Sequence, residues 1–303
     1  MTDPQLDHAV QQLTLGLLVD TYGLLRQAWW ASLRVQECAD DAPWNTWHDD
    51  DDPRGEARDL LVRAGEHSAI MTGQAITRHL GLLSRAYGPD PAVPEDGPDA
   101  DRWPHSAVYP QARAIAEGTA LFAWLLDAGA DRAERVLRGA RLTLWSNAGK
   151  WADDVEAAGL EVRRDPRPEG RQGPPYVWAG EGSGPLTPGN VVKIVHGRRA
   201  SDDSQRWGKM LHNDPGVLGP RSTLRIGETG AHLGSQVRED EHLELARDIT
   251  ALLRTAGQRQ AAYWGRSAAE LVEACDRATA SVGDVLPDVA AHVKERHALL
   301  YEG

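Results

Sequence analysis

The sequence predicts an all-α, or at least mostly α, protein that folds as a helical bundle. Apolar residues recur at three- and four-residue steps over long segments, and segments with the two-residue alternation of strands are few and short. Signals that start or end helices flank the long segments. The chain has 303 residues, of which 41% are hydrophobic, so it can bury a core and is not expected to be disordered. We interpret residues 1–303 as a single helical domain.

Two long helices are expected in the first third of the chain. From Leu6 to about residue 35, two adjoining apolar stripes follow the helical period, which indicates a helix packed on more than one side. Pro53 after Asp52 is a favourable helix start, because proline fits the first turn and an acidic residue complements the helix dipole. The second helix is therefore expected over residues 57–87.

The middle of the chain adds two more helices and a long loop. A third helix is expected over residues 106–128. Asp131 with Glu134 resembles a capping box, which opens a fourth helix over residues 131–158. Residues 163–186 are rich in proline and glycine, and we interpret them as a long loop or insertion.

The last third returns to helices. Residues 191–196 suit either a helix or a strand, because their β-branched run fits both periods. A helix is expected over residues 202–213, and residues 215–234 are expected to be loop with at most one short strand pair. Three closing helices are expected over residues 238–264, 268–281 and 285–301.

Composition excludes several classes of function. The net charge is −12 and no basic stripe is visible, which counts against general DNA binding because phosphate neutralisation supplies most of that affinity. No apolar run approaches the ~20 residues of a membrane span, and the N-terminus lacks the layout of a signal peptide. The two cysteines, Cys38 and Cys275, offer no metal cluster. We therefore expect a cytoplasmic protein without a metal site or cofactor.

Arg113 and Glu117 form the first candidate pair. They are four residues apart and therefore share one face of the expected third helix, where they can form an ion pair. Their neighbours are strongly apolar, so the pair is expected to be at least partly buried. It serves either as a structural ion pair or as the polar floor of a pocket.

Arg206 and His212 form the second candidate pair. Six helical positions place two side chains about 240° apart around the axis, so they share a site only if the helix ends near His212 or if two copies meet. Asn213 and Pro215 favour such an end. A histidine in a last helical turn is also favoured by the helix dipole alone, so a structural role for His212 stays open.

Residues 112–137 and 207–216 resemble an actinobacterial all-helical family that is similar to HEPN-type (higher eukaryote and prokaryote nucleotide-binding) domains. The resemblance implies a HEPN-like core and a metal-independent ribonuclease or toxin-like effector. It assigns His212 as general acid or base, with Arg206, assisted by Arg113, stabilising charge on the phosphate. It also implies a homodimer with the site at the interface. Trp207 stands where the nuclease members usually carry a polar residue.

Two other classes of function remain open beside the ribonuclease. The first is a non-catalytic helical module that binds a small-molecule ligand or a partner, with Arg113, Glu117 and Trp207 lining the binding site. The second is a helical enzyme of specialised metabolism, which would use the eleven tryptophans to line an interior pocket.

Overall fold

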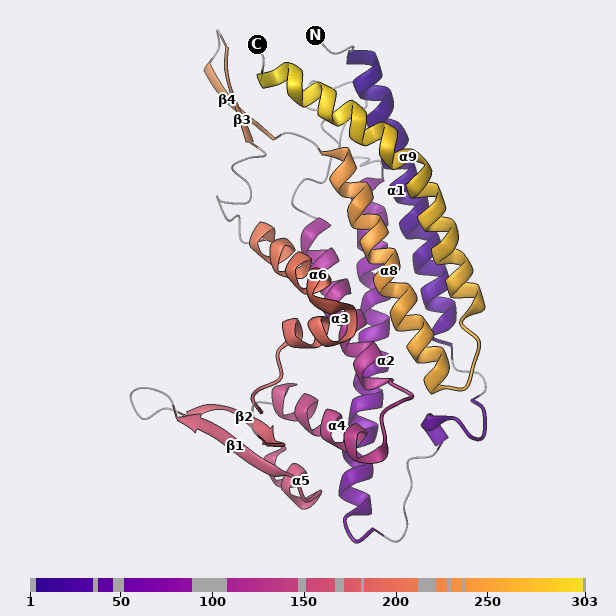
Figure 1. Ribbon diagram of the computed structural model, residues 1–303, viewed down its shortest axis with the longest axis vertical. Helices are drawn as coiled ribbons and strands as arrows, with labels where there is room; N and C mark the ends of the chain where they lie inside the picture. The colour runs from indigo at the N-terminus through magenta and orange to yellow at the C-terminus, as the bar shows by residue number, and fades with distance from the viewer. Residues whose placement is uncertain are drawn as a thin grey trace.

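The structure, a computed structural model, consists mostly of helices and confirms the mostly α fold class (Figure 1). It describes residues 4–34, 38–45, 52–88, 108–146, 151–166, 172–180, 183–211, 222–227, 230–235 and 238–301. The α-helices are α1 (Pro4–Ser32), α2 (Gly55–Tyr87), α3 (Tyr109–Leu125), α4 (Arg132–Ser146), α5 (Ala152–Ala157), α6 (Pro188–Leu211), α8 (Glu239–Tyr263) and α9 (Ala269–Tyr301). A short 3-10 helix, η1 (Pro43–Asn45), follows α1.

The helices form an elongated bundle in which α1, α2, α8 and α9 run along the long axis (Figure 1). Helix α3 packs between α2 and α8, and α6 covers the other side of α3. Helices α4 and α5 lie against the N-terminal half of α2, away from the end of the bundle where both chain termini lie. This arrangement surrounds α3, the most apolar of these helices, with other elements.

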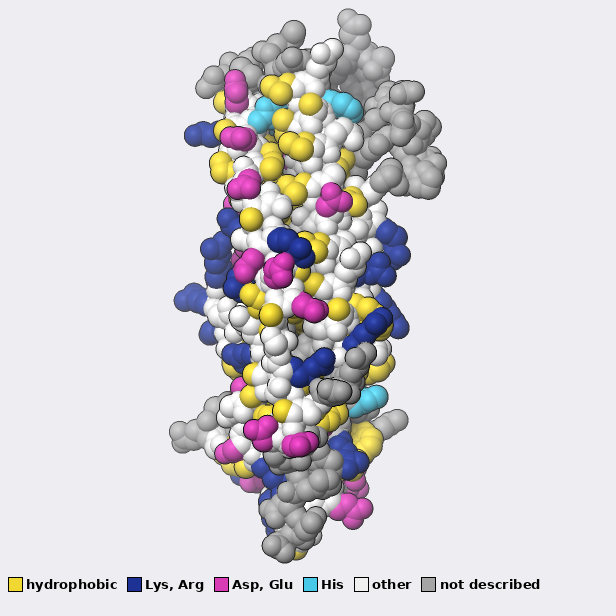
Figure 2. Space-filling model, turned by 90° about the vertical axis from the view of Figure 1, so that its right-hand side faces the viewer, with side chains coloured by type: hydrophobic (Ala, Val, Ile, Leu, Met, Phe, Trp, Pro, Cys, Tyr) yellow, Lys and Arg dark blue, Asp and Glu magenta, His cyan; other side chains and the backbone are white. Residues whose placement is uncertain are grey.

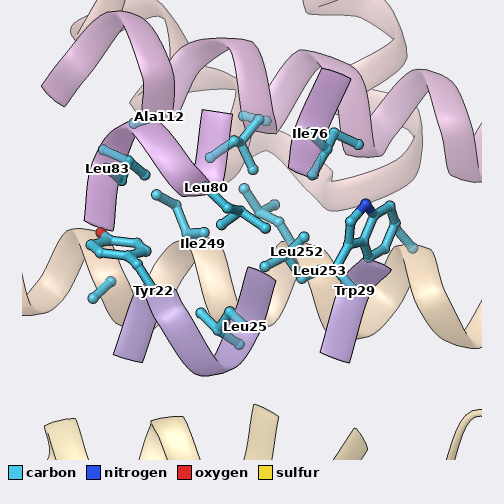
Figure 3. Close-up of a cluster of buried hydrophobic side chains, with 14 of the residues drawn as sticks. Tyr22, Leu25, Trp29, Ile76, Leu80, Leu83, Ala112, Ile249, Leu252 and Leu253 are labelled. Carbon is cyan, nitrogen blue, oxygen red and sulfur yellow. The ribbon is translucent and has the colours of Figure 1, made fainter. Parts of the chain in front are cut away.

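The main core lies where α1, α2, α3 and α8 meet (Figure 3). Helix α1 supplies side chains at a helical spacing and α2 faces it with a second row, all of them fully or almost fully buried: Leu18, Tyr22, Leu25, Trp29, Ile76, Leu80 and Leu83. The indole nitrogen of Trp29 donates a hydrogen bond to the carbonyl oxygen of Gly73 at 2.9 Å. Of the two apolar stripes expected on the first helix, the one with Leu18, Tyr22, Leu25 and Trp29 is confirmed as a core face. In the neighbouring stripe Leu6 and Leu13 are 51% and 58% exposed, so that stripe is not fully covered.

The start of α4 confirms the predicted cap, because Asp131 Oδ1 accepts a hydrogen bond from the backbone nitrogen of Glu134 at 2.8 Å. The single helix expected over residues 131–158 is instead two helices, α4 and α5. The two closing helices expected over residues 268–281 and 285–301 are one continuous helix, α9, with Pro287 inside it. Its buried side chains continue on both sides of the proline and pack in the main core, which outweighs one missing backbone hydrogen bond.

The described residues include two β-hairpins, one more than the single strand pair that the sequence predicts. Strands β3 (Ser222–Gly227) and β4 (Gly230–Ser235) form the antiparallel pair expected within residues 215–234. The second pair, β1 (Glu161–Pro166) and β2 (Gln172–Trp178), forms within the segment interpreted as a Pro/Gly-rich loop over residues 163–186.

The β1–β2 hairpin forms because it has an apolar side to bury. Val177 is fully buried in a second core cluster with side chains of α2 and α4, and it pairs with Val162 of β1. Pro175 lies in a two-stranded sheet, in which each strand has one edge without a neighbouring strand. A proline whose nitrogen lies on that edge removes no hydrogen bond between the strands. The prolines that indicated a loop are therefore compatible with a strand.

Residues 191–196, which suit a strand or a helix by sequence, belong to α6. Val191 and Val192 are buried in the main core, and this packing favours the helix over the strand that their β-branched side chains would also suit. The helix kinks at Gly197, where φ is 86° and ψ is 175°, a backbone conformation that is essentially restricted to glycine. None of the helices in the described ranges is long and apolar enough to cross a membrane.

Candidate functional site

Arg113 and Glu117 form the predicted ion pair on α3. The Nε atom of Arg113 donates a hydrogen bond to Glu117 Oε1 at 2.8 Å, and both side chains are partly exposed. Arg113 also lies directly against α6, because a Cβ atom added at Gly208 would fall 2.4 Å from its Nη1 atom. The absence of a side chain at Gly208 therefore allows the guanidinium group to approach the α6 backbone.

Trp207 and Arg206 lie in different surroundings on α6. The side chain of Trp207 is 2% exposed and packs in the main core, so it is a core residue and lines none of the described pockets. Arg206 is 52% exposed and forms an ion pair with Asp203 at 3.4 Å on the outer face of α6. Since Arg206 and Gly208 are two helical positions apart, they face nearly opposite sides of α6.

His212 lies outside the described residues, so the predicted pairing of Arg206 with His212 stays a prediction. The structure does place α6 so that Gly208, one helical turn before His212, contacts Arg113. Of the five predicted site residues, it therefore brings together Arg113 and Glu117. The side chain of Arg206 lies on the outer face of α6, and that of Trp207 is buried in the main core.

Glu117 lines a pocket that we call the Glu117 pocket. Its volume is about 170 Å³, and it lies where α3, the end of α4 and the start of α6 meet. The described residues that line it are Glu117, Gly118, Leu121, Trp145, Leu186, Pro188 and Val191. The indole of Trp145 is 46% exposed, so a large aromatic surface is available at the pocket. The walls are otherwise apolar.

Glu117 is the one ionisable side chain among the described residues of this lining. Its Oε1 atom accepts the hydrogen bond from Arg113, and within the described ranges no hydrogen bond reaches its second carboxylate oxygen. The Arg113 guanidinium lies against Gly208 and does not line the pocket. The pocket can therefore offer a carboxylate oxygen to a hydrogen-bond donor inside an apolar surround.

His196 is a polar residue that sequence reasoning missed. Its Nε2 atom lies 3.2 Å from Thr119 Oγ1, and the Thr119 hydroxyl already donates to the carbonyl of Ile115 at 2.8 Å, so His196 Nε2–H is the donor to Thr119. Burial, reinforced by the positive charge of Arg259, lowers the pKa of His196 to about 4. The imidazole is therefore neutral at neutral pH. Its hydrogen bond to Thr119 connects α6 to α3 one residue before the kink at Gly197.

Glu66 belongs to a second polar cluster that the sequence did not reveal. Its side chain is 6% exposed, and it accepts a hydrogen bond from the Tyr263 hydroxyl of α8. Burial raises the pKa of Glu66 to about 7, against the opposing effects of the Tyr263 hydrogen bond and of Arg135 and Arg63. The Arg135 guanidinium lies 5.5 Å from the centre of the Tyr263 ring. Because none of the described pockets is lined by Glu66, we interpret this cluster as structural.

A third polar cluster joins α2, α8 and α9. Tyr87 Oη lies 2.7 Å from Nδ1 of His242, and Arg296 binds Glu239 through two hydrogen bonds of 2.9 and 2.6 Å. Glu239 and His242 have the spacing of a carboxylate and a histidine that bind a metal, but their partners here are protein side chains. Over the described residues, no group of three histidine, cysteine or acidic side chains could hold a metal ion.

The face formed by α1 and α9 carries interspersed acidic and basic side chains (Figure 2).

Comparisons of this chain with protein-family models, curated proteins and solved structures found no match. The HEPN resemblance therefore stays a prediction from residues 112–137 and 207–216.

Proposed function

We propose that this protein is a helical module that binds a small-molecule ligand in the Glu117 pocket. The observation that carries the proposal is an apolar pocket with one convergent carboxylate and a half-exposed indole in its lining. Binding sites commonly combine apolar walls with a small number of polar groups that orient the ligand. At about 170 Å³ the pocket fits a ligand with one ring or a short alkyl body.

Binding fits the geometry better than catalysis for the described residues. Arg206 is exposed and paired with Asp203, and the neutral His196 is not among the residues that line the pocket. The enzyme of specialised metabolism needs several tryptophans around one pocket, whereas the described lining of the Glu117 pocket contains Trp145 alone. Trp29 and Trp264 are buried in the main core, and Trp264 is the one tryptophan in the described lining of a separate pocket between α1, α8 and α9.

The test is binding of toluene and benzyl alcohol, two neutral single-ring probes, measured by ligand-observed NMR. We expect both to bind the wild-type protein and to lose binding in Leu121→Trp, where the larger side chain fills the pocket. Ile194→Trp, at a position of α6 that is 68% exposed and outside the pocket, is the matched control and should bind as the wild type does. Leu186→Trp is a second filling variant, on the segment that precedes α6, should Leu121→Trp fail to fold.

The metal-independent ribonuclease is a second candidate, which one contact favours. Arg113 lies against Gly208, which precedes His212 by four residues, about one helical turn. Arginine is a residue that commonly binds phosphate groups. Wild type and His212→Ala would be incubated with total RNA in the absence of metal ions. Cleavage by the wild type alone supports this candidate, and equal cleavage, or none by either protein, rejects it.

A homodimer, a cytoplasmic location and the absence of general DNA binding accompany these candidates as expectations. The homodimer follows from the HEPN resemblance, and light scattering at several protein concentrations tests it. A monomer at all concentrations would remove the shared phosphate site but would leave the Glu117 pocket intact, because the described residues of its lining come from one chain.

A further inference from the structure

We infer that the ligand of the Glu117 pocket is a small organic cation, with an ammonium group on a single ring or short alkyl body. This inference rests on the proposed function, because it names the chemical class that the same pocket selects. Charge, aromatic surface and size each support it.

The ionisable side chain in the described lining of the pocket is a carboxylate, whose charge the ion pair with Arg113 offsets only in part. Glu117 lines the pocket, whereas the guanidinium of its partner Arg113 lies against the backbone at Gly208. A carboxylate oxygen without a hydrogen-bond partner among the described residues is an acceptor for an ammonium N–H, and charge-assisted hydrogen bonds are the stronger kind. A carboxylate or phosphate ligand would instead meet a like charge in an apolar surround, which is unfavourable.

The aromatic surface favours the same charge. Trp145 lines the pocket and keeps 46% of its surface exposed. Among aromatic side chains, the indole face attracts cations most strongly, and the attraction increases when the cation is partly desolvated. A carboxylate and an indole in the lining of one apolar pocket form a recurrent arrangement for organic ammonium groups.

Size and the charge of the whole chain complete the argument. Leu121, Leu186 and Val191 give apolar contact to a ring, and a cavity of about 150 Å³ is enough for benzene. A volume of about 170 Å³ therefore fits one ring with a short ammonium substituent. The net charge of −12 attracts cations to the protein surface and repels anions.

Three probes with one ring and different charges test the inference: benzylammonium, benzyl alcohol and benzoate, each titrated calorimetrically at low salt. We expect benzylammonium to bind about tenfold more tightly than benzyl alcohol, since a charge-assisted hydrogen bond and a cation–π contact add to the same apolar burial. Benzoate should bind most weakly. High salt should reduce the advantage of benzylammonium.

Two carboxylate variants locate the effect. Glu117→Gln should abolish the preference for benzylammonium and leave benzyl alcohol binding within about twofold of the wild type, because the apolar walls are unchanged. Glu134→Gln is the matched control: Glu134 is also paired with an arginine four residues away, Arg138, but it lies outside the described lining of the pocket. This control should keep the full preference, and melting temperatures would verify that both variants fold.

The outcomes separate this inference from the proposed function. If benzyl alcohol and benzylammonium bind equally, or if Glu117→Gln keeps the preference, the cation inference is wrong and the binding function stands. If benzoate binds most tightly, the inference is wrong in sign. If none of the three probes binds the folded wild-type protein, the proposed function fails together with the inference.

Discussion

Glu66 is a carboxyl group that folding removes from water. It lies on α2 and accepts a hydrogen bond from the Tyr263 hydroxyl, and its pKa in the folded protein is about 7, against an ordinary value of 4.5. The cause is burial, which disfavours the charged form more strongly than the Tyr263 hydrogen bond, Arg135 and Arg63 favour it. Ionisation of Glu66 therefore lowers the free energy of unfolding.

The stability of the protein should consequently fall as pH rises through neutrality. Because the folded pKa is raised, the contribution of Glu66 is fully present below about pH 4.5 and is lost as pH rises through about 7. We expect Glu66→Gln, which keeps an acceptor for Tyr263 but cannot ionise, to gain about 3 kcal/mol relative to the wild type between pH 4.5 and pH 8. Urea unfolding across this range measures it, and parallel curves for the two proteins would contradict it.

The sequence predicted only the polar contacts that are local in the chain. Arg113 and Glu117 were identified because their spacing of four residues places them on one helical face. The partner of Glu66 is 197 residues away and the partner of His196 is 77 residues away, so no local spacing relates them. The pocket residues Trp145 and Leu186 were missed for the same reason, since α3, α4 and α6 meet only in the tertiary structure.

At the scale of elements, the crossing of α2 and α4 depends on one glycine. A Cβ atom at Gly139 of α4 would lie 2.1 Å from the backbone carbonyl oxygen of Leu61 on α2. The two helices can approach this closely only because position 139 has no side chain. The close approach lets a second core cluster form between α2 and its neighbours. It includes Val136, Ala140 and Val177.

Gly139→Ala should therefore destabilise the protein by about 3 kcal/mol, because a backbone atom cannot move aside as a flexible side chain can. Gly65→Ala is a control at the same crossing. Its Cβ would meet the Leu125 side chain at 3.5 Å and the Gly139 Cα at 3.6 Å, which are ordinary contacts. Since alanine also favours helix, Gly65→Ala should be neutral or slightly stabilising. Chemical denaturation compares the two, and equal losses would reject a specific clash at position 139.

Helical periodicity predicted where helices exist better than where they end. The break expected between residues 281 and 285 lies inside the continuous helix α9, which also contains Pro287, while Pro175, in the segment expected to be loop, lies in β2. In both places burial of apolar neighbours outweighs the local preference of proline, and burial depends on elements far away in the sequence. The kink at Gly197 was likewise hidden, because a glycine in a helical pattern is compatible with a straight helix or a break.

At the scale of the whole molecule, buried and partly buried polar side chains connect the first helix to the last two. Arg296 of α9 binds Glu239, the fully buried first residue of α8, and His292 of α9 lies 2.6 Å from Asp7 of α1. The Asp7–His292 contact joins residues 285 positions apart in the chain. The sequence predicted α1 and α8 and divided α9 into two helices, and it did not predict how these elements pair at one end of the bundle, where these long-range contacts form.

Loss of one partner at this end should therefore destabilise the bundle more than loss of both. Arg296→Met would leave the Glu239 carboxylate buried without its guanidinium partner, and we expect a loss of about 3–5 kcal/mol. In the double variant Arg296→Met with Glu239→Leu, apolar side chains replace the whole pair. That variant should recover most of the loss, apart from a small cost because an acidic residue favours the α8 N-terminus.

Urea unfolding of the wild type, both single variants and the double variant gives the coupling energy between Arg296 and Glu239. Hydrogen exchange locates the change, and we expect Arg296→Met to increase exchange in α9 near Arg296 and at the start of α8, with less effect where α2 crosses α4. If the double variant loses the sum of the two single losses, the partners do not compensate each other. The attachment of α9 would then depend on its apolar face, at Val282, Val289 and Val293, and not on the charges at its end.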